Sequence, residues 1–197
     1  MSKAERTKAY IIERAAPVFN TKGYSGTSMS DIVQATQLTK GAIYGNFTGK
    51  DEVAIEVYKY NFGALRKRIA NAMLAETTAQ ARLKAYTNYY RTNWQQVQER
   101  GGCPLLNAAV EADDNVAFMR KNVQASARQW IKDIRTVIQA GIDSGEFRAD
   151  LDAQQMATSV CMMLEGGMMF FKIMDDRTLL FHALDRIDRM VTQEMMR

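Results

Sequence analysis

The sequence has few of the residues that build covalently stapled or proline-rigid proteins. Among its 197 residues there are only two prolines, two cysteines and one histidine. Two prolines exclude a proline-rich linker protein, and two cysteines are too few for a disulfide scaffold, so a reducing compartment is expected. The single histidine, His182, cannot by itself supply a metal site or a catalytic triad. We therefore predict neither catalytic nor metal-binding residues, and no cofactor.

Signals for secretion, membrane insertion and strands are also missing. The first ten residues lack the apolar core of a signal peptide. The most apolar stretch, residues 156–174, contains Glu165, Lys172 and two glycines, which argues against a membrane span. The alternation typical of strands is absent. We therefore expect an all-α protein located in the cytoplasm.

Helical periodicity runs through nearly the whole chain. Helices are expected over about residues 4–21, 50–74, 78–99, 115–144, 152–174 and 178–196. Shorter helices are expected after Ser28, after Thr39 and after Cys103, because Ser and Thr favour the N-cap and proline favours the first helical position. The sequence therefore predicts about nine helices.

The positive charge is concentrated at the N-terminal end. Residues 1–50 contain seven Lys or Arg and three Asp or Glu, a net charge of +4, whereas residues 51–197 contain 19 of each. A basic end on a neutral body suggests an anionic partner, nucleic acid first and a membrane surface second. We predict a three-helix DNA-binding domain over residues 1–49 and a six-helix domain for ligand binding and dimerisation over residues 50–197.

The second and third predicted helices have helix-turn-helix spacing, which places the later helix in the DNA major groove. Thr39 would cap that helix, and Lys40 and Tyr44 would project from it as donors to phosphates or base edges. Gly41 has no side chain, so the backbone there can approach DNA closely. Lys50 is a cation in the first turn of its helix, where the helix dipole disfavours positive charge, and a nearby phosphate would offset this cost. A small three-helix core with incidental polar residues would show the same spacing.

The segment from Thr27 to Lys50 resembles the DNA-binding signature of TetR-type (TetR/AcrR family) transcriptional repressors. The resemblance implies a homodimer that binds a palindromic operator and releases it when a small molecule enters the body. Gln37 departs from the family pattern, which usually has a turn glycine there. By position, the resemblance implies DNA contacts at Thr27, Ser28, Thr39, Lys40, Gly41, Ala42, Tyr44, Asn46 and Lys50.

Aromatic side chains at helical spacing in the body indicate either an ordinary core or an apolar ligand cavity. The resemblance implies a pocket between the fourth and seventh helices. Asn107 and Glu111 are candidate polar anchors for an apolar or aromatic ligand. The residues predicted to bind the ligand are Phe62, Leu65, Tyr86, Tyr90, Trp94, Cys103, Leu106, Asn107 and Trp130.

Cys103 allows a more specific hypothesis. If Pro104 is the first helical residue, Cys103 is the N-cap, where the helix dipole stabilises a thiolate. Such a thiol would suit a switch that responds to electrophiles or oxidants. The alternative is a small, inert, buried cap residue.

The last two predicted helices have broad apolar faces. Gly166 and Gly167 would let two helices approach closely, and the methionines between residues 156 and 174 form an adaptable surface. The resemblance implies a four-helix dimer interface here, while the alternative is that both helices close the monomer's own core. The predicted interface residues are Met163, Gly167, Phe171, Leu184, Ile187 and Met190.

Together these features predict a ligand-responsive repressor that binds double-stranded DNA as a homodimer, with a small-molecule effector, no membrane partner and no enzymatic activity. Two other classes stay open. One is an α-helical enzyme or ligand carrier whose basic head tethers it to DNA. The other, an architectural DNA binder, would need positive charge along its whole length, whereas residues 51–197 have no net charge.

Overall fold

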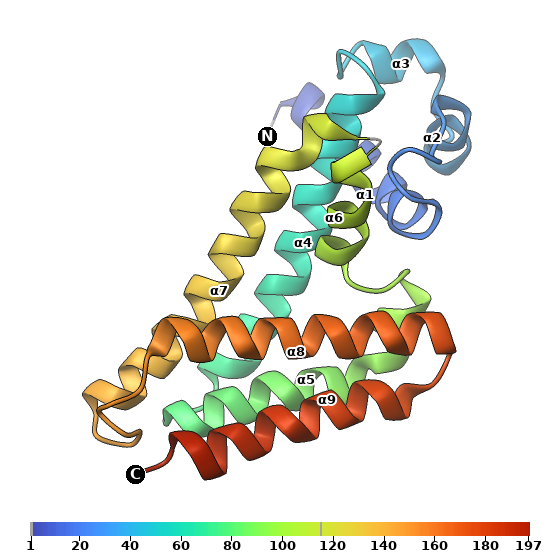
Figure 1. Cartoon of the computed structure of the whole chain (residues 1–197). Helices are drawn as coiled ribbons and strands as arrows, with labels where there is room; N and C mark the ends of the chain where they lie inside the picture. The colour runs from blue at the N-terminus through green and yellow to red at the C-terminus, as the bar shows by residue number, and fades with distance from the viewer. Residues whose placement is uncertain (1, 115) are drawn as a thin grey trace. The chain divides into compact units, whose positions relative to one another are not determined.

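The computed structural model describes residues 2–114 and 116–197, and over them the chain is all-helical (Figure 1). One isolated antiparallel bridge, between Phe147 and Met196, interrupts this pattern. The all-α prediction and the number of α-helices in the described residues are confirmed. The helices are α1 (Lys3–Lys22), α2 (Met29–Thr36), α3 (Lys40–Tyr44), α4 (Lys50–Leu74), α5 (Ala79–Glu99), α6 (Pro104–Asp114), α7 (Arg120–Asp143), α8 (Ala153–Met174) and α9 (Arg177–Arg189).

Capping side chains set the starts of the two helices of the helix-turn-helix. At α2, the Ser28 side chain accepts the Asp31 N–H, and the Asp31 carboxylate accepts the Ser28 N–H in return. At α3, Thr39 Oγ1 accepts the Ala42 N–H at 3.1 Å. These bonds satisfy donors that have no partner inside a helix. The predicted starts of both helices are confirmed.

Two predicted helices differ in their boundaries. The helix expected over 115–144 begins at Arg120, because Ala117–Met119 form a 3₁₀ turn, η1, and residue 115 lies outside the described residues. The helix expected over 178–196 ends at Arg189 and continues as a π-helix, η2, over Met190–Met195. Periodicity alone does not distinguish these helix types from an α-helix over so few residues.

Gln37 ends α2 in the left-handed conformation, with φ 58° and ψ 23°. Its backbone N–H donates to the Val33 carbonyl, and its side chain donates to the Gln34 carbonyl at 2.7 Å. A residue with a Cβ in this conformation costs about 1–2 kcal/mol relative to the right-handed helix. The turn is therefore made with a positive φ although no glycine stands there.

The chain forms two compact units. Unit 1 comprises Met1–Ala64 and Glu99–Ser126, and unit 2 comprises Leu65–Gln98 and Ala127–Arg197. These units do not follow the boundary predicted at residues 49 and 50, because the first part of α4, all of α6 and the start of α7 cluster with the N-terminal helices. The functional division at that boundary stays a prediction.

In the core of unit 1, aromatic side chains join α1 and the turn after it to α4. Phe19, Tyr24 and Tyr58 are each fully buried. Ring centroids lie 5.6 Å apart for Phe19 and Tyr24, and 6.2 Å apart for Tyr24 and Tyr58. Each such side chain contributes about 1.5–3 kcal/mol through removal from water. This cluster therefore anchors Tyr24, in the turn before α2, in the core of unit 1.

Unit 2 contains the contact between α8 and α9 and a polar link from α5 to α9. The Asp188 carboxylate accepts hydrogen bonds from Lys84, Thr87 and Arg91 at 2.6–2.7 Å. Burial alone would raise the pKa of Asp188, but these three donors outweigh it and hold the pKa below its usual range. The charged form of Asp188 thus stabilises the packing of α9 on α5.

Candidate nucleic-acid interface

The short helix α3 has one buried and one exposed face. Ile43 is fully buried and Phe47, just after the helix, is 2% exposed, so both anchor α3 in the core of unit 1. Lys40 and Gly41 are exposed, and Tyr44 is 48% exposed. The Lys40 ammonium lies 5.9 Å from the centroid of the Tyr44 ring. The inner face of α3 is thus apolar and buried, while its outer face exposes a cation, a phenol and bare backbone to solvent.

The space beside Gly41 is empty of protein. A Cβ built on Gly41 would meet only the Thr39 hydroxyl, at 4.0 Å. Packing in the described residues therefore does not require glycine at this position. Next to it, Ala42 is half-buried, and its carbonyl accepts a hydrogen bond from the Asn46 side chain at 2.9 Å. The Asn46 amide therefore helps to end α3 as well as standing at a predicted contact position.

Two neighbouring residues predicted to contact phosphates lie in different environments. Ser28 is exposed and caps α2. Thr27 is fully buried, and its hydroxyl donates to the Gly23 carbonyl at 2.6 Å. In this arrangement the Thr27 hydroxyl is committed to the turn before α2, because a buried hydroxyl without a partner would be costly. The Thr27 hydroxyl therefore already has a partner within the protein, and its contact with a phosphate stays a prediction.

Lys50, the third predicted phosphate contact, has protein partners that the sequence did not reveal. Its ammonium donates to the carbonyls of Tyr24 and Ser25, at 3.3 Å each. These carbonyls compensate for the unfavourable placement of a cation in the first turn of α4. A phosphate is therefore not needed to explain a lysine at this position.

Two basic side chains near the predicted interface are paired with carboxylates of the same unit. Lys22 lies 2.6 Å from Asp31, and Lys8 lies 3.4 Å from Glu52. The Lys22 hydrogen bond, with those from Ser28, holds the pKa of Asp31 well below its usual range. None of the ion pairs found between the side chains that the structure describes involves Lys40. The Lys40 ammonium is therefore available to contact an external partner.

The residues predicted to bind a ligand fall into both units. In unit 2, the rings of Tyr86 and Tyr90 lie 5.7 Å apart, edge to face. The Tyr86 hydroxyl is buried and has no acceptor for its proton among the described residues. Burial, followed by the charges of Tyr90, Cys161 and Glu165, raises the pKa of Tyr86 well above its usual value, and the Trp130 side chain opposes this. Tyr86 and Tyr90 therefore form a buried aromatic pair, and their contact with a ligand stays a prediction.

Other predicted ligand residues take part in packing. Trp94 lies edge to face against Phe171, with centroids 6.0 Å apart, and the Arg177 guanidinium covers its ring at 5.1 Å. In unit 1, the Phe62 ring stacks on Tyr58 at 6.2 Å. Leu65 in unit 2 is 7% exposed. These contacts are what a core requires, so a ligand-binding role for these residues stays a prediction.

The N-terminal end of α6 differs from the ligand-binding prediction. α6 begins at Pro104, as predicted, and Cys103 before it is only 6% exposed. Asn107, predicted as a polar anchor for the ligand, donates instead to the Asn20 carbonyl at 3.1 Å and to the Gly101 carbonyl at 2.8 Å. The Asn107 side-chain amide thus donates its hydrogen bonds to backbone carbonyls of α1 and of the segment before α6. Leu106, also predicted to bind the ligand, is half-buried.

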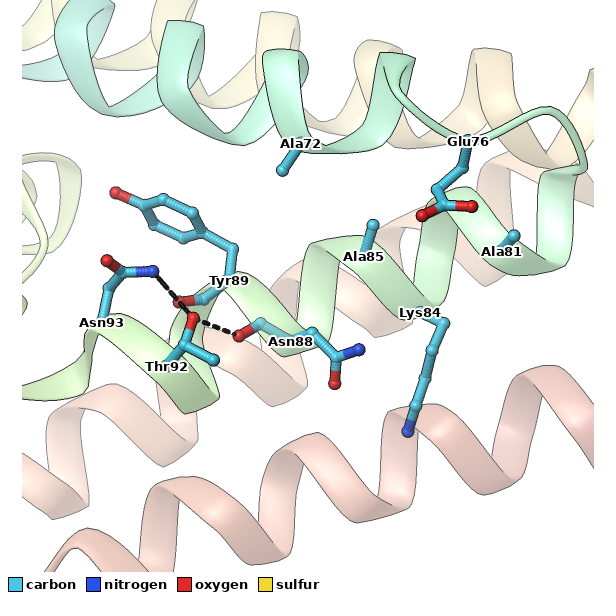
Figure 2. A pocket seen from close by; sticks show the side chains of 9 residues that line it. All are labelled: Ala72, Glu76, Ala81, Lys84, Ala85, Asn88, Tyr89, Thr92 and Asn93. Atoms are coloured by element: carbon cyan, nitrogen blue, oxygen red, sulfur yellow. Dashed lines mark hydrogen bonds between the residues drawn. The ribbon is translucent and has the colours of Figure 1, made fainter.

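The structure hollows an open groove in unit 2 at a place the sequence did not suggest (Figure 2). Its volume is about 480 Å³, and it contains none of the predicted ligand residues. Its lining comes from the end of α4, the residue Glu76 and one face of α5. Two small residues one helical turn apart on α5, Ala81 and Ala85, are a signal that could have indicated a shallow surface there. The lining residues are Ala72, Glu76, Ala81, Lys84, Ala85, Asn88, Tyr89, Thr92 and Asn93.

Most of the predicted dimer residues are buried within one chain. Phe171, Leu184, Ile187 and Met190 are each at most 4% exposed, and Met163 is half-buried. Gly167 is buried too. A Cβ on it would lie 2.5 Å from the Cβ of Ala183 on α9. Gly167 thus lies in the contact between α8 and α9, and the burial of the others is compatible with the alternative that both helices close the monomer's own core; a dimer role for these residues stays a prediction.

The exposed apolar residues of α8 lie on another face of that helix. Met162 and Ile173 are 68% exposed, Phe170 is 48% exposed and Met169 is 38% exposed. A Cβ on Gly166 would meet nothing within 4 Å. By length and composition α8 could also cross a membrane, with a mean hydropathy of 1.2, but core helices of soluble proteins pass the same test. We call Met162, Gly166, Met169, Phe170 and Ile173 the outer face of α8.

Comparison with known proteins agrees with the helix-turn-helix geometry. Residues 11–57 match the family of bacterial regulatory proteins of the tetR family, and residues 79–187 match the tetracyclin repressor-like C-terminal domain. The chain is 25% identical over 184 residues to the HTH-type transcriptional repressor DhaR of Mycobacterium sp. (strain GP1), covering 90% of this chain and 91% of that protein.

Solved structures extend the likeness to the whole fold. A TetR-family transcriptional regulator from Cytophaga hutchinsonii has a TM-score of 0.94 and 36% identity, covering 100% of this chain and 98% of that one. A cysteine mutant of the TetR-family regulator CifR, solved with a 26-bp operator DNA, has a TM-score of 0.82 and 20% identity, covering 92% and 94%. The model of the C-terminal domain alone spans more than half of this chain, and the chain belongs to the TetR family of transcriptional regulators.

Proposed function

We propose that this regulator is a repressor that binds a palindromic operator through the exposed face of α3 and is not an enzyme. The observation that carries the proposal is the pair of opposite faces on α3. Ile43 fixes the helix in the core, while Lys40, Gly41 and Tyr44 stay exposed beside open space. Lys40 would contact phosphate or a base edge, and the backbone at Gly41 would approach the DNA closely. A DNA partner would place the protein in the cytoplasm.

The test uses the DNA fragment that the wild-type protein selects from a random-sequence pool. Gly41→Ala adds a methyl group where the protein has space, so the fold is expected to be retained. The same methyl would stand between α3 and the DNA, and we expect an affinity at least tenfold weaker. Gly63→Ala is the matched control, because a Cβ there also meets nothing within 4 Å. Equal affinities for the two variants would contradict the proposed interface.

We also propose that two copies of the chain associate through the outer face of α8. Four large apolar side chains stand exposed there beside an open glycine, which is the composition of a helix-helix interface. A two-fold dimer would set its recognition helices about 34–36 Å apart, one turn of DNA. This replaces the interface predicted from the buried residues of α8 and α9.

Light scattering across a concentration series tests the dimer. Ile173→Glu puts a charge on the outer face of α8 and is expected to give monomers at concentrations where the wild type is dimeric. Leu74→Glu is the matched control, since Leu74 is 71% exposed and lies at the end of α4. A dimer that persists in the Ile173 variant would exclude this face.

For the effector, we propose an apolar or aromatic molecule that carries a hydrogen-bond acceptor for the Tyr86 hydroxyl. The support is the fully buried Tyr86, whose hydroxyl has no acceptor for its proton in the described structure. An unmade hydrogen bond in a low-dielectric interior is costly, so an acceptor on a ligand would gain affinity there. The rest of the predicted ligand set stays a prediction, as does a response of Cys103 to electrophiles.

Tyr86→Phe separates the two roles of this residue. We expect it to keep or raise the free energy of unfolding of the free protein, because it removes a buried O–H donor that has no acceptor. The same change should weaken DNA release by an effector found through thermal-shift screening. An unchanged effector concentration for half-release would refute this role of Tyr86.

A further inference from the structure

We infer that Glu111 and Asn107 of α6 are positioning residues for DNA binding, acting through the turn at residues 23–27. This inference rests on the proposed function. Both residues were candidate ligand anchors from the sequence alone. In the structure Glu111 binds backbone N–H groups of the turn between α1 and α2, and Asn107 binds a backbone carbonyl near the end of α1, all in the same unit.

The Glu111 carboxylate binds two consecutive backbone donors of the turn. It accepts the Tyr24 N–H at 2.9 Å and the Ser25 N–H at 2.7 Å. Charge-assisted hydrogen bonds of this kind are short and about twice as strong as neutral ones. Gly23 makes the approach feasible: its φ is +87°, and a Cβ there would lie 2.7 Å from the Glu111 carboxylate. The glycine and the glutamate therefore form one fitted contact.

Lys50 binds the same two residues from their carbonyl groups. Its ammonium donates to the Tyr24 and Ser25 carbonyls at 3.3 Å. The backbone N–H groups of this turn therefore bind the Glu111 carboxylate of α6, and its backbone carbonyls bind the Lys50 ammonium of α4. The buried Tyr24 ring fixes the depth of the turn, and the two charged groups fix the orientation of its backbone.

A second contact joins the end of α1 to the segment before α6. The Asn20 side chain, 5% exposed, donates to the carbonyls of Arg100 and Gly102. Asn107 donates to the carbonyls of Asn20 and Gly101. Gly101 has a φ of +89°, and a Cβ there would clash with the Asn20 carbonyl. Two amides and a glycine thus bind α1 to α6 three residues before the turn.

The turn is linked directly to the helix-turn-helix. The buried Thr27 donates both its N–H and its hydroxyl to the Gly23 carbonyl, and Ser28 then caps α2. Residues 23–28 therefore form one hydrogen-bonded unit between Glu111 and the start of α2. If Glu111 is removed, this unit has more than one orientation available, and only a fraction of molecules keep α2 and α3 in the binding geometry. Apparent affinity falls in proportion to that fraction.

The chain offers a closely matched control for Glu111. Glu146 in unit 2 also accepts two consecutive backbone N–H groups, those of Ala79 and Gln80, at 2.8 Å each. Glu146→Gln and Glu111→Gln therefore make the same chemical change in the same kind of contact. Of these two glutamates, Glu111 binds the turn before α2 and Glu146 binds the start of α5.

The experiment measures affinity for the DNA that the wild type selects, with the thermal unfolding midpoint of each variant. We expect Glu111→Gln to weaken binding about tenfold and Glu146→Gln to change it less than twofold, with similar midpoint shifts. Equal losses of affinity in the two variants would show a merely structural carboxylate and overturn the inference. Asn107→Asp, which turns a carboxylate toward the Asn20 and Gly101 carbonyls, should also weaken binding, by at least fivefold.

Amide hydrogen exchange gives a readout that does not need DNA. The Tyr24 and Ser25 amides should lose protection in Glu111→Gln and keep it in Glu146→Gln. Retained protection in Glu111→Gln would overturn the inference even if affinity had fallen. If the wild type selects no DNA sequence, the proposed function fails, and the exchange data still decide whether Glu111 holds the turn.

Discussion

Two adjacent glycines of α8 give opposite predictions for one substitution. A Cβ at Gly166 meets nothing within 4 Å, whereas a Cβ at Gly167 would lie 2.5 Å from the Ala183 Cβ and 3.5 Å from the Leu180 Cα. Alanine stabilises a helix interior by about 1 kcal/mol relative to glycine, and this gain applies to both sites. At residue 167 it is opposed by overpacking, which costs about 1–3 kcal/mol because α8 and α9 must move apart.

We therefore expect Gly166→Ala to raise the free energy of unfolding by about 1 kcal/mol and Gly167→Ala to lower it by about 1 kcal/mol. For a chain of this size, a change of 1 kcal/mol shifts the melting temperature by about 2–4 °C. Scanning calorimetry at several protein concentrations measures both shifts and separates any effect of association. Equal shifts of the same sign would refute the assignment of the α8–α9 contact to Gly167.

Three further predictions concern the remaining parts of the fold. Gln37→Gly relieves the left-handed conformation and should stabilise the protein by about 0.5–1 kcal/mol, whereas Gln34→Gly, on an exposed helical site, should destabilise it by about as much; chemical denaturation checks both signs. Because the folded pKa of Asp188 is lowered, its contribution is complete above the unfolded value of about 4 and is lost as the pH falls through the folded value. Asp188→Asn should therefore cost about 1–3 kcal/mol at pH 7 and less at pH 3, and an equal loss at both would contradict the network. Burial, with Glu165 and Asp133 nearby, raises the pKa of Cys161 to about 12, so iodoacetamide at pH 8 should leave it unmodified until the protein unfolds, as mass spectrometry would show.

Local signals carried most of the fold. The Ser28 and Thr39 caps predicted the starts of α2 and α3, because capping depends on residues three positions apart in the sequence. Pro104 marked the start of α6 for a similar local reason. The extra 3₁₀ and π segments were missed, since their hydrogen bonds differ from those of an α-helix by a single residue.

The features that could not be predicted from the sequence depend on contacts between residues that are far apart in the chain. Glu111 lies 86 positions from Ser25 in the chain, and no local pattern links the two. An apolar stripe shows that a helix buries a face but not which neighbour covers it, so Gly167 was placed in a dimer interface although α9 of the same chain packs on it. Thr27 was assigned to phosphate by its position in the family pattern, while the structure commits its hydroxyl to Gly23.

The central claim is that the protein recognises one DNA sequence through α3. The most direct measurement is selection of genomic fragments by the purified protein, followed by titration of the recovered fragment at several salt concentrations. We expect one shared palindrome, with affinity falling steeply as salt rises, since each phosphate neutralised releases bound counterions. Fragments that share no sequence and bind no better than bulk DNA would contradict the claim.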